Sequence, residues 1–450
     1  MKLKKVVALT LSAGMVASMT ACGSKPAEET TAAPATETTK AADGATEAAG
    51  TEGGELSGEL TVNVWDYDAN PSMSIIVDGY MEKNPGVKIN VIDTSADEYN
   101  NSLGVSLSAA QPDPDVIFVK DMGSMLQMAD KEQILCMDDL IAKENFDLGI
   151  YKGVAEELQY NGKTYGLPWR NDWYILFYNK DLFDAAGVEY PSNDMTWDEY
   201  YDLAAKMTSG EGSAKVYGTH HHTWEALVSA FAIQDGKNSY VSEDYSFMKP
   251  WYEKTLWLQD NGYMQSYANL KTANIHYSSV FKNEQAAMMP IGTYFIATLI
   301  QAQEDGECDF NWGIATLPHS EGMEPGYAVG ATTPLAISAY TDVPDLAWDF
   351  VKYATSPEAA GLLASVGSFP AVLTDDALNT IAGIDGFPQD GTSKDALKYV
   401  NFVFDRPLDP DIEAIRVPFN ETHEMIMIGE YTIDEGLAER QKRVAEIKGW

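Results

Sequence analysis

The sequence predicts an α/β protein with two domains. Residues 60–65, 87–92 and 115–119 are short runs of apolar and β-branched side chains that predict strands, and a helical segment ending near residue 84 separates the first two. Strands and helices at this spacing predict a parallel sheet with right-handed crossovers. A chain of 450 residues with 45% hydrophobic content is long enough to form two cores.

The composition is strongly acidic, with a formal net charge of −38 at neutral pH. This balance argues against nucleic acid as a partner, because neutralising phosphates requires Lys and Arg in excess. Its main consequence is solubility and repulsion from anionic surfaces.

The N-terminus has the layout of an export signal. Lys2, Lys4 and Lys5 precede an apolar stretch, residues 6–19, that is too short to span a membrane. The stretch ends in Met19-Thr20-Ala21-Cys22-Gly23, which resembles a bacterial lipobox. This resemblance implies that residues 1–21 are a lipoprotein signal peptide and that Cys22 carries acyl chains that hold the protein at a membrane. Ordinary signal cleavage with an incidental cysteine is the alternative.

Residues 22–59 are predicted to be a disordered acidic tether. They consist mainly of Thr, Ala, Glu and Gly, which cannot bury enough apolar surface to offset chain entropy. The folded part is predicted to start near Leu60. Cys136 and Cys308 remain as thiols of an exported protein, and the sequence leaves open whether they pair.

The segment from Asn161 to Gly187 has the strongest local pattern. Pro168 predicts a bend, because its missing N–H interrupts a central strand. Residues 173–178 then predict a buried strand, and a helix is expected from Asp181 until Gly187 ends it. Between the bend and the strand lie Trp169, Arg170, Asn171 and Asp172, a flat ring and three hydrogen-bonding groups that suit a ligand better than a core.

At this point the sequence resembles the extracellular solute-binding proteins of ABC sugar importers, in the branch that includes maltose-binding protein. The matching residues run from Leu60 to the C-terminus with few gaps. They are Gly162-Lys163-Thr164-Tyr165-Gly166-Leu167-Pro168, Tyr178-Asn179-Lys180-Asp181-Leu182-Phe183, Ala186-Gly187, Thr196-Trp197-Asp198-Glu199, 281–289, Gly292-Thr293-Tyr294, Trp348, Ser356-Pro357-Glu358, Phe369-Pro370-Ala371 and 429–437.

The resemblance implies a two-lobed periplasmic-binding-protein fold of type II. Each lobe would be a mainly parallel sheet flanked by helices, with crossing strands as the hinge. The N-terminal lobe would comprise residues 60–168 and 337–412, and the C-terminal lobe residues 169–330 and 413–450. Residues 331–336 would form part of the hinge.

A sugar site needs flat rings for stacking and planar polar groups for paired hydrogen bonds. By resemblance, Asp172 and Tyr294 fall where the family often contacts ligand, and Trp224 lies in a segment that usually supplies an aromatic ring. The predicted ligand-binding residues are Trp65, Tyr67, Asp121, Trp169, Arg170, Asp172, Trp224, Tyr294 and Phe369.

No catalytic, metal or cofactor site is predicted. His220-His221-His222 suggests a metal, but adjacent residues point in different directions and no other ligand has a convincing spacing. A Gly-x-Ser-x-Gly elbow is absent from the sequence. Two alternatives stay open: a binding protein for a phosphodiester, polyamine or iron, and a carbohydrate-active enzyme with two facing carboxylates.

The expected function is capture of a carbohydrate, with an oligosaccharide favoured, in a cleft between the lobes. The expected partners are the transmembrane subunits of an ABC permease and, through Cys22, the outer face of the cytoplasmic membrane. The protein is expected to be a monomer, without nucleic acid or cofactors.

Overall fold

The computed structural model describes residues 56–67, 71–95 and 98–450. The predictions for the signal peptide, for Cys22 and for the tether up to residue 55 therefore lie outside the described residues. None of the helices in the described ranges is both long and apolar enough to cross a membrane.

The strands form a nine-stranded sheet in the order β2-β1-β3-β10-β6-β8-β7, with β11 paired to β10 and β9 paired to β6, and a separate β4-β5 pair. The strands are β1 (Ser57–Trp65), β2 (Gly86–Thr94), β3 (Val116–Phe118), β4 (Gln159–Tyr160), β5 (Lys163–Thr164), β6 (Leu167–Asn179), β7 (Tyr217–Thr219), β8 (Ala286–Gly292), β9 (Trp312–Thr316), β10 (Tyr327–Ile337) and β11 (Asn401–Phe404).

The helices are α1 (Pro71–Lys83), α2 (Tyr99–Ser108), α3 (Met122–Asp130), α4 (Asp138–Glu144), α5 (Val154–Glu157), α6 (Lys180–Ala186), α7 (Trp197–Met207), α8 (Ala226–Ile233), α9 (Lys249–Asp260), α10 (Tyr267–Thr272), α11 (Tyr277–Lys282), α12 (Phe295–Glu304), α13 (Pro344–Ala354), α14 (Pro357–Ser365), α15 (Asp375–Ala382), α16 (Gly391–Asp395), α17 (Ile412–Met427) and α18 (Ile433–Lys448). They cover both parts of the sheet: α2 and α13 contact β1, whereas α7 contacts β7 and β8.

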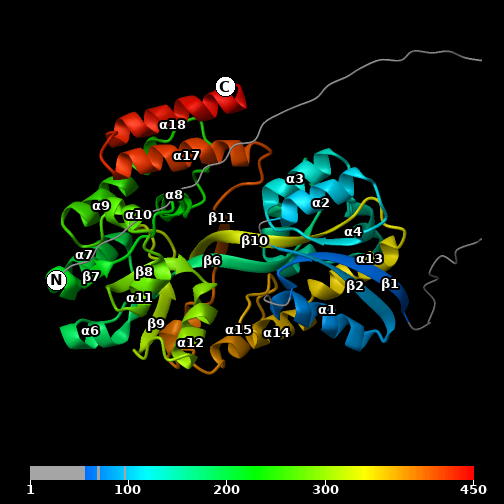
Figure 1. Cartoon of the computed structure of the whole chain (residues 1–450), viewed down its shortest axis with the longest axis horizontal. Helices are drawn as coiled ribbons and strands as arrows, with labels where there is room; N and C mark the ends of the chain where they lie inside the picture. Colours follow the sequence, from blue (N-terminus) through cyan, green and yellow to red (C-terminus); the bar gives the residue numbers. More distant parts are fainter. Residues whose placement is uncertain (1–55, 68–70, 96–97) are drawn as a thin grey trace, which may run out of the picture. The chain divides into compact units, whose positions relative to one another are not determined.

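The pairing of the strands is mixed. β1 is parallel to β2 and β3, as predicted. The prediction of a mainly parallel sheet in the second lobe is wrong, because β6 runs antiparallel to β8 and β9 as well as to β10. The chain passes along the sheet through β6 and returns through β10, so these neighbours are traversed in opposite directions. Figure 1 shows β6 and β10 side by side between two groups of helices.

Pro168 disturbs the strand ladder, as predicted, but it does not interrupt the strand. β6 is one strand of 13 residues, and Pro168 is its second residue. The missing donor is accommodated locally, because the ladder shifts register where Pro168 faces Pro334 of β10. At the other end, the Asn179 side chain accepts from the backbone N–H of Leu182, and Gly187 ends α6 with a φ of 64°.

The apolar side chains form two core clusters. Helices α13 and α14 pack on α1, and α18 packs on α9 and α17. One observation runs against the predicted lobe boundary at residue 412. The segment around α16 contacts the part of the sheet that was assigned to the second lobe. The Ser393 hydroxyl accepts from the N–H of Ile314 in β9 at 3.1 Å, and Asp390 pairs with Lys180 of α6.

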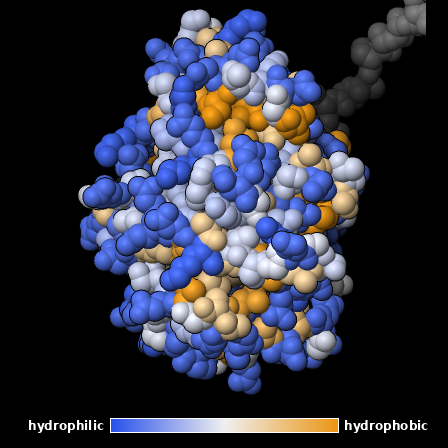
Figure 2. All heavy atoms as spheres, turned by 90° about the vertical axis from the view of Figure 1, so that its left-hand side faces the viewer, coloured by the Kyte–Doolittle hydropathy of each residue, from blue (hydrophilic) through white to orange (hydrophobic). Residues whose placement is uncertain are grey.

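The face on the left-hand side of Figure 1 carries hydrophilic residues over most of its area, with hydrophobic side chains gathered in separate patches (Figure 2). This distribution agrees with the excess of acidic residues in the composition. Exposed charges of this kind favour solubility and do not determine the fold.

Cys136 and Cys308 are free thiols in the structure, which answers the question that the sequence left open. Burial raises the pKa of both thiols, so their unreactive protonated forms are favoured.

Arg440 on α18 is a buried cation at the centre of the second core. Its side chain is fully buried and donates to the hydroxyls of Thr422 at 3.0 Å and Tyr252 at 2.8 Å. Its guanidinium carbon also lies 4.2 Å from the centre of the Phe419 ring. These hydrogen bonds and ring contacts stabilise the charge and connect α18 to α17 and α9. In the described part of the chain no carboxylate forms an ion pair with Arg440.

Replacing Arg440 by Ala is expected to lower the free energy of unfolding by about 3–5 kcal/mol, because a cavity forms and the hydroxyls of Tyr252 and Thr422 each lose a buried donor. Urea denaturation measures the change. Lys442→Ala is the matched control on the same helix, where the side chain is 64% exposed, and should change the value by less than about 0.5 kcal/mol. A loss below about 1 kcal/mol for Arg440→Ala would contradict the anchoring role.

Candidate ligand-binding site

The alternation of side chains along β6 defines two faces. Arg170, Asp172 and Tyr174 are partly exposed, whereas the residues between them are buried. Successive side chains of a strand point to opposite sides of the sheet, so the three partly exposed residues share one face. We call this the open face of β6.

Trp169 and Phe369 were predicted to bind ligand, but the structure places both side chains in the core. Each side chain is only 1% exposed. The ring of Trp169 packs edge-on against Phe118 at 5.1 Å, and that of Phe369 packs against Trp173 at 4.8 Å. Trp169 has the opposite parity to Arg170 along the strand, and this places its ring in the core.

The predicted ligand residues Trp65, which ends β1, and Tyr67, which follows this strand, differ in how far they are buried. Trp65 is 9% exposed and packs edge-on against Tyr99 at 5.1 Å. Tyr67 is partly buried, and its backbone N–H donates to Oδ1 of Asp93 at 3.1 Å. The structure therefore places the Trp65 ring mainly in the first core.

Asp172 and Arg170 form a loose ion pair on the open face. Nε of Arg170 lies 3.6 Å from Oδ2 of Asp172, and both side chains keep part of their surface exposed. The hydroxyl of Thr293 donates to Oδ1 of Asp172 at 3.2 Å. Burial raises the pKa of Asp172, and the Arg170 charge opposes this shift. The pair thus offers donors and acceptors that are only partly used.

Aromatic rings lie beside this pair. Tyr294 follows Thr293 in the chain and is 40% exposed, and Trp224 is 39% exposed. Tyr277 connects them, with its ring 5.5 Å from Trp224 and 6.5 Å from Tyr294. His222 also contacts Trp224 edge-on at 4.7 Å. We call Trp224, Tyr277, Tyr294 and His222 the aromatic group; it provides exposed ring surface for stacking.

A second acid–base group lies near Tyr174 and was missed in the sequence. Arg406 lies 3.6 Å from Glu225 and 3.8 Å from Asp405, measured between guanidinium nitrogens and carboxylate oxygens. Burial raises the pKa of Tyr174, and Asp405 raises it further, which places the two side chains within electrostatic reach. The backbone brings them together, because β11 pairs with β10 and the Asp405 N–H donates to the carbonyl of Gly330.

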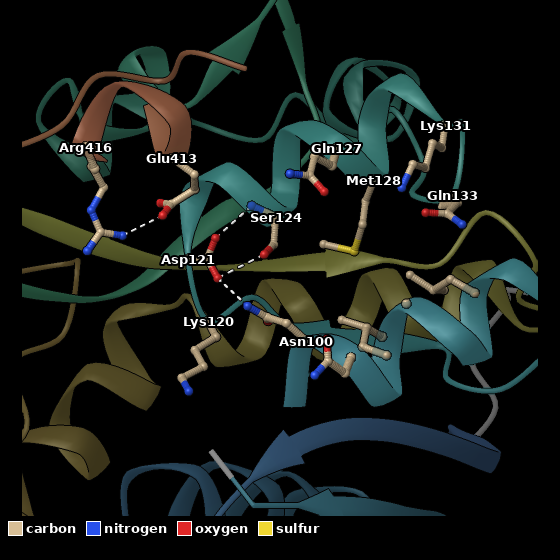
Figure 3. Close-up of a pocket in the computed structure, with 14 residues that line it drawn as sticks. Asn100, Lys120, Asp121, Ser124, Gln127, Met128, Lys131, Gln133, Glu413 and Arg416 are labelled. Carbon is tan, nitrogen blue, oxygen red and sulfur yellow. Dashed lines mark hydrogen bonds and ion pairs between the residues drawn. The ribbon is translucent and has the colours of Figure 1, made fainter. Parts of the chain in front are cut away.

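A pocket of about 560 Å³ lies between α2, α3 and the first turns of α17. Figure 3 shows Glu413 and Arg416 approaching it from the side opposite Asn100. Burial raises the pKa of Asp405, and the Arg416 charge is one of those that oppose this shift, which links the pocket electrostatically to the acid–base group at Arg406. Its size is within the range typical of small-molecule sites.

Asp121 was predicted as a ligand residue and does line this pocket, where it caps α3. Its carboxylate accepts from the Ser124 N–H at 2.8 Å, from the Ser124 hydroxyl at 2.9 Å and from Nδ2 of Asn100 at 2.7 Å (Figure 3). These bonds fix the two helix ends that shape the pocket. Polar side chains around it that sequence reasoning missed are Asn100, Ser124, Gln127, Glu413 and Arg416.

His220 and His221 precede His222 of the aromatic group, and the His220 ring lies 6.0 Å from that of His222. His220 and His221 are buried, as is His423 of α17. Burial lowers the pKa of each of these three imidazoles to about 3. His221 Nε2 is 2.9 Å from the Tyr200 hydroxyl, and His423 Nδ1 is 3.1 Å from that of Tyr252. In the described ranges no three His, Cys, Asp or Glu side chains are arranged to hold a metal ion.

Comparison with known proteins finds similarity to bacterial solute-binding proteins. The family described as bacterial extracellular solute-binding protein matches residues 68–361. A sugar transporter from Rhizobium etli in an open conformation is similar with a TM-score of 0.83 and 37% identity, over 86% of this chain and 99% of that one. An ABC substrate-binding protein from Listeria monocytogenes in complex with cycloalternan has a TM-score of 0.71 and 22% identity, over 88% and 100%. The predicted two-lobed α/β fold is thus confirmed.

Curated relatives are matched over shorter stretches. The sn-glycerol-3-phosphate-binding periplasmic protein of Agrobacterium fabrum is 28% identical over 149 residues, which are 28% of this chain and 34% of the relative. The multiple sugar-binding protein of Streptococcus mutans is 28% identical over 221 residues, which are 46% of this chain and 50% of the relative. The matches therefore span a third to a half of these relatives' length.

Lowering the pH below about 6.5 is expected to reduce the free energy of unfolding, because the unfolded chain takes up protons on histidines that stay neutral when folded. Each buried histidine contributes a slope of up to about 1.4 kcal/mol per pH unit between its unfolded and folded pKa. His423→Gln should therefore show a shallower dependence between pH 6 and 5 in urea denaturation, and the same dependence as the parent protein above pH 7.5. Equal slopes between pH 6 and 5 would contradict this.

Proposed function

Because this chain belongs to the family of bacterial extracellular solute-binding proteins, we propose that it captures a carbohydrate, in particular an oligosaccharide, and delivers it to the transmembrane subunits of an ABC permease. The observation that carries the proposal is the exposed aromatic group beside the Arg170–Asp172 pair. A pocket of about 560 Å³ adds to it, because its lining residue Arg416 is within electrostatic reach of Asp405. Sugars combine apolar C–H faces with hydroxyls, and this arrangement offers a partner for each.

Each part of the site has a distinct role in this proposal. The rings of Trp224 and Tyr294 stack on sugar faces. Asp172 accepts from sugar hydroxyls while Arg170 donates to them, and Tyr174 adds a hydroxyl between these groups and Asp405. The pocket between α2, α3 and α17 receives further sugar units.

Capture would proceed by closure about a hinge. We assign residues 60–168 and 337–412 to the N-terminal lobe and residues 169–330 and 413–450 to the C-terminal lobe, except for the α16 segment that contacts β9. The crossing strands β6 and β10, including residues 331–336, would act as the hinge. Ligand would bind one lobe first and shift the population toward the closed form as the other lobe completes the site. The ligand would be released chemically unaltered.

The N-terminal segment would determine where the protein lies in the cell. Residues 1–21 would be removed as a lipoprotein signal peptide, and Cys22 would anchor a monomer to the outer face of the cytoplasmic membrane. The segment from residue 22 would serve as the tether between this anchor and the lobes; it would end before residue 59, the predicted bound, because β1 already begins at Ser57.

Trp224→Ala is expected to weaken saccharide binding about 10- to 100-fold, because it removes a stacking surface from the centre of the site. Calorimetric titration with the saccharide that gives the largest thermal shift in a screen measures the change. Since the ring is already 39% exposed, the thermal midpoint without ligand should change little.

Trp257→Ala is the matched control for this experiment. Trp257 is 37% exposed, belongs to α9 and contacts Tyr263 at 4.9 Å, outside the aromatic group. It should leave affinity unchanged. Equal affinity of the Trp224 and Trp257 variants would show that the site is elsewhere, and new reducing ends in the recovered saccharide would show that the protein is an enzyme.

A further inference from the structure

We infer that the ligand of this site carries no net charge, so that phosphorylated, uronic and amino sugars are rejected in favour of neutral saccharides. This inference rests on the proposed function, and it adds the charge class of the substrate. The sequence alone left that class open, because Arg170 by itself suits an anion as well as a hydroxyl.

The first observation is the balance of charges around the site. The basic side chains on the open face of β6, in the acid–base group and around the pocket are Lys120, Lys131, Arg170, Arg406 and Arg416. The acidic ones are Asp121, Asp172, Glu225, Asp405 and Glu413. Among these described residues the two sets are equal in number, so together they carry no net charge to balance a charged ligand.

The second observation is the geometry of the paired charges. Arg170 lies 3.6 Å from Asp172, and Arg406 lies 3.6 and 3.8 Å from its two carboxylates. These separations are too long for hydrogen bonds. Within the described ranges neither guanidinium donates a hydrogen bond, and Nε of both is buried without a partner. The Arg170 guanidinium therefore stands beside a carboxylate, Asp172, that among the described residues accepts only from Thr293, whereas Glu225 already accepts from Tyr240 and Ser229.

A hydroxyl group suits such a pair better than an anion does. It can accept from the guanidinium and donate to the adjacent carboxylate, so both members are satisfied. A carboxylate or phosphate on the ligand can only accept at neutral pH, and it adds a like charge beside Asp172 or Asp405. A primary ammonium can only donate, and it adds a like charge beside the arginines.

The surroundings make this discrimination strong. Burial raises the pKa of Asp172 and Asp405, and the Asp405 side chain is only 11% exposed. Like charges brought together across an interface cost several kcal/mol when water is excluded. We therefore expect an anionic or cationic analogue to bind at least about 100-fold more weakly than a neutral saccharide of the same size.

The test is a calorimetric panel on the full chain at about pH 6, where the amino groups of an amino sugar are protonated and sugar carboxylates are ionised. The neutral probes are maltotriose, cellotriose, xylotriose, mannotriose, arabinotriose and raffinose; the anionic probes are trigalacturonate, sialyllactose and sn-glycerol 3-phosphate; the cationic probe is deacetylated chitotriose. Binding of a neutral probe at least 100-fold tighter than all charged probes supports the inference. A charged probe that binds as tightly as the best neutral one overturns it and leaves the proposed function standing, whereas silence across all saccharides overturns both.

Asp172→Asn tests the cause of the discrimination. The amide keeps the shape and removes the negative charge, so Arg170 is left uncompensated. The ratio of the neutral to the anionic affinity should fall at least tenfold in this variant. Glu421→Gln is the matched control, because Glu421 pairs with Arg443 on the exposed side of α17; it should leave the ratio unchanged. An unchanged ratio in Asp172→Asn would overturn the assignment of the selectivity to this pair.

Discussion

The structure depends on the pairing of one long strand. β6 pairs with β10 through its first half and with β8 and β9 through its second, so it belongs to both parts of the sheet. Because it is held in a ladder on both sides, its side chains cannot change parity without moving every neighbour. The packing of Trp169 against Phe118 and of Trp173 against Phe369 fixes that parity. Arg170, Asp172 and Tyr174 face the site as a consequence.

The same constraint explains which site residues the sequence could predict. Of the predicted residues, Asp172, Trp224 and Tyr294 lie on exposed or partly exposed surface. The Trp169 ring lies in the core, and its residue type could not reveal this, because aromatic rings are common both in cores and in sugar sites. The alternation of side chains along the strand could have indicated this burial, because Trp169 and Trp173 point to one face of the sheet while Arg170 and Asp172 point to the other.

The residues that the sequence could not provide come from distant parts of the chain. Asp405 and Arg406 reach the site because β11 adds to β10 next to β6, and Glu413 and Arg416 reach it at the start of α17. No local motif marks them, since each is an ordinary charged residue in its own segment. For the same reason strand directions were mispredicted, because periodicity identifies strands without identifying their neighbours.

The position of α17 shows how the core supports the site. Its first turns carry Glu413 and Arg416 to the pocket, and its later turns carry Thr422 to buried Arg440. Pro418 lies between these ends, and its carbonyl accepts from the Thr422 hydroxyl at 2.6 Å. A proline removes one bond of the helical ladder, so the first turns are held less by the helix itself and more by their contacts. The positions of Glu413 and Arg416 at the pocket therefore depend in part on the buried network of Arg440 and Thr422, which anchors the later turns of α17. The residues that line the pocket do not determine these positions by themselves.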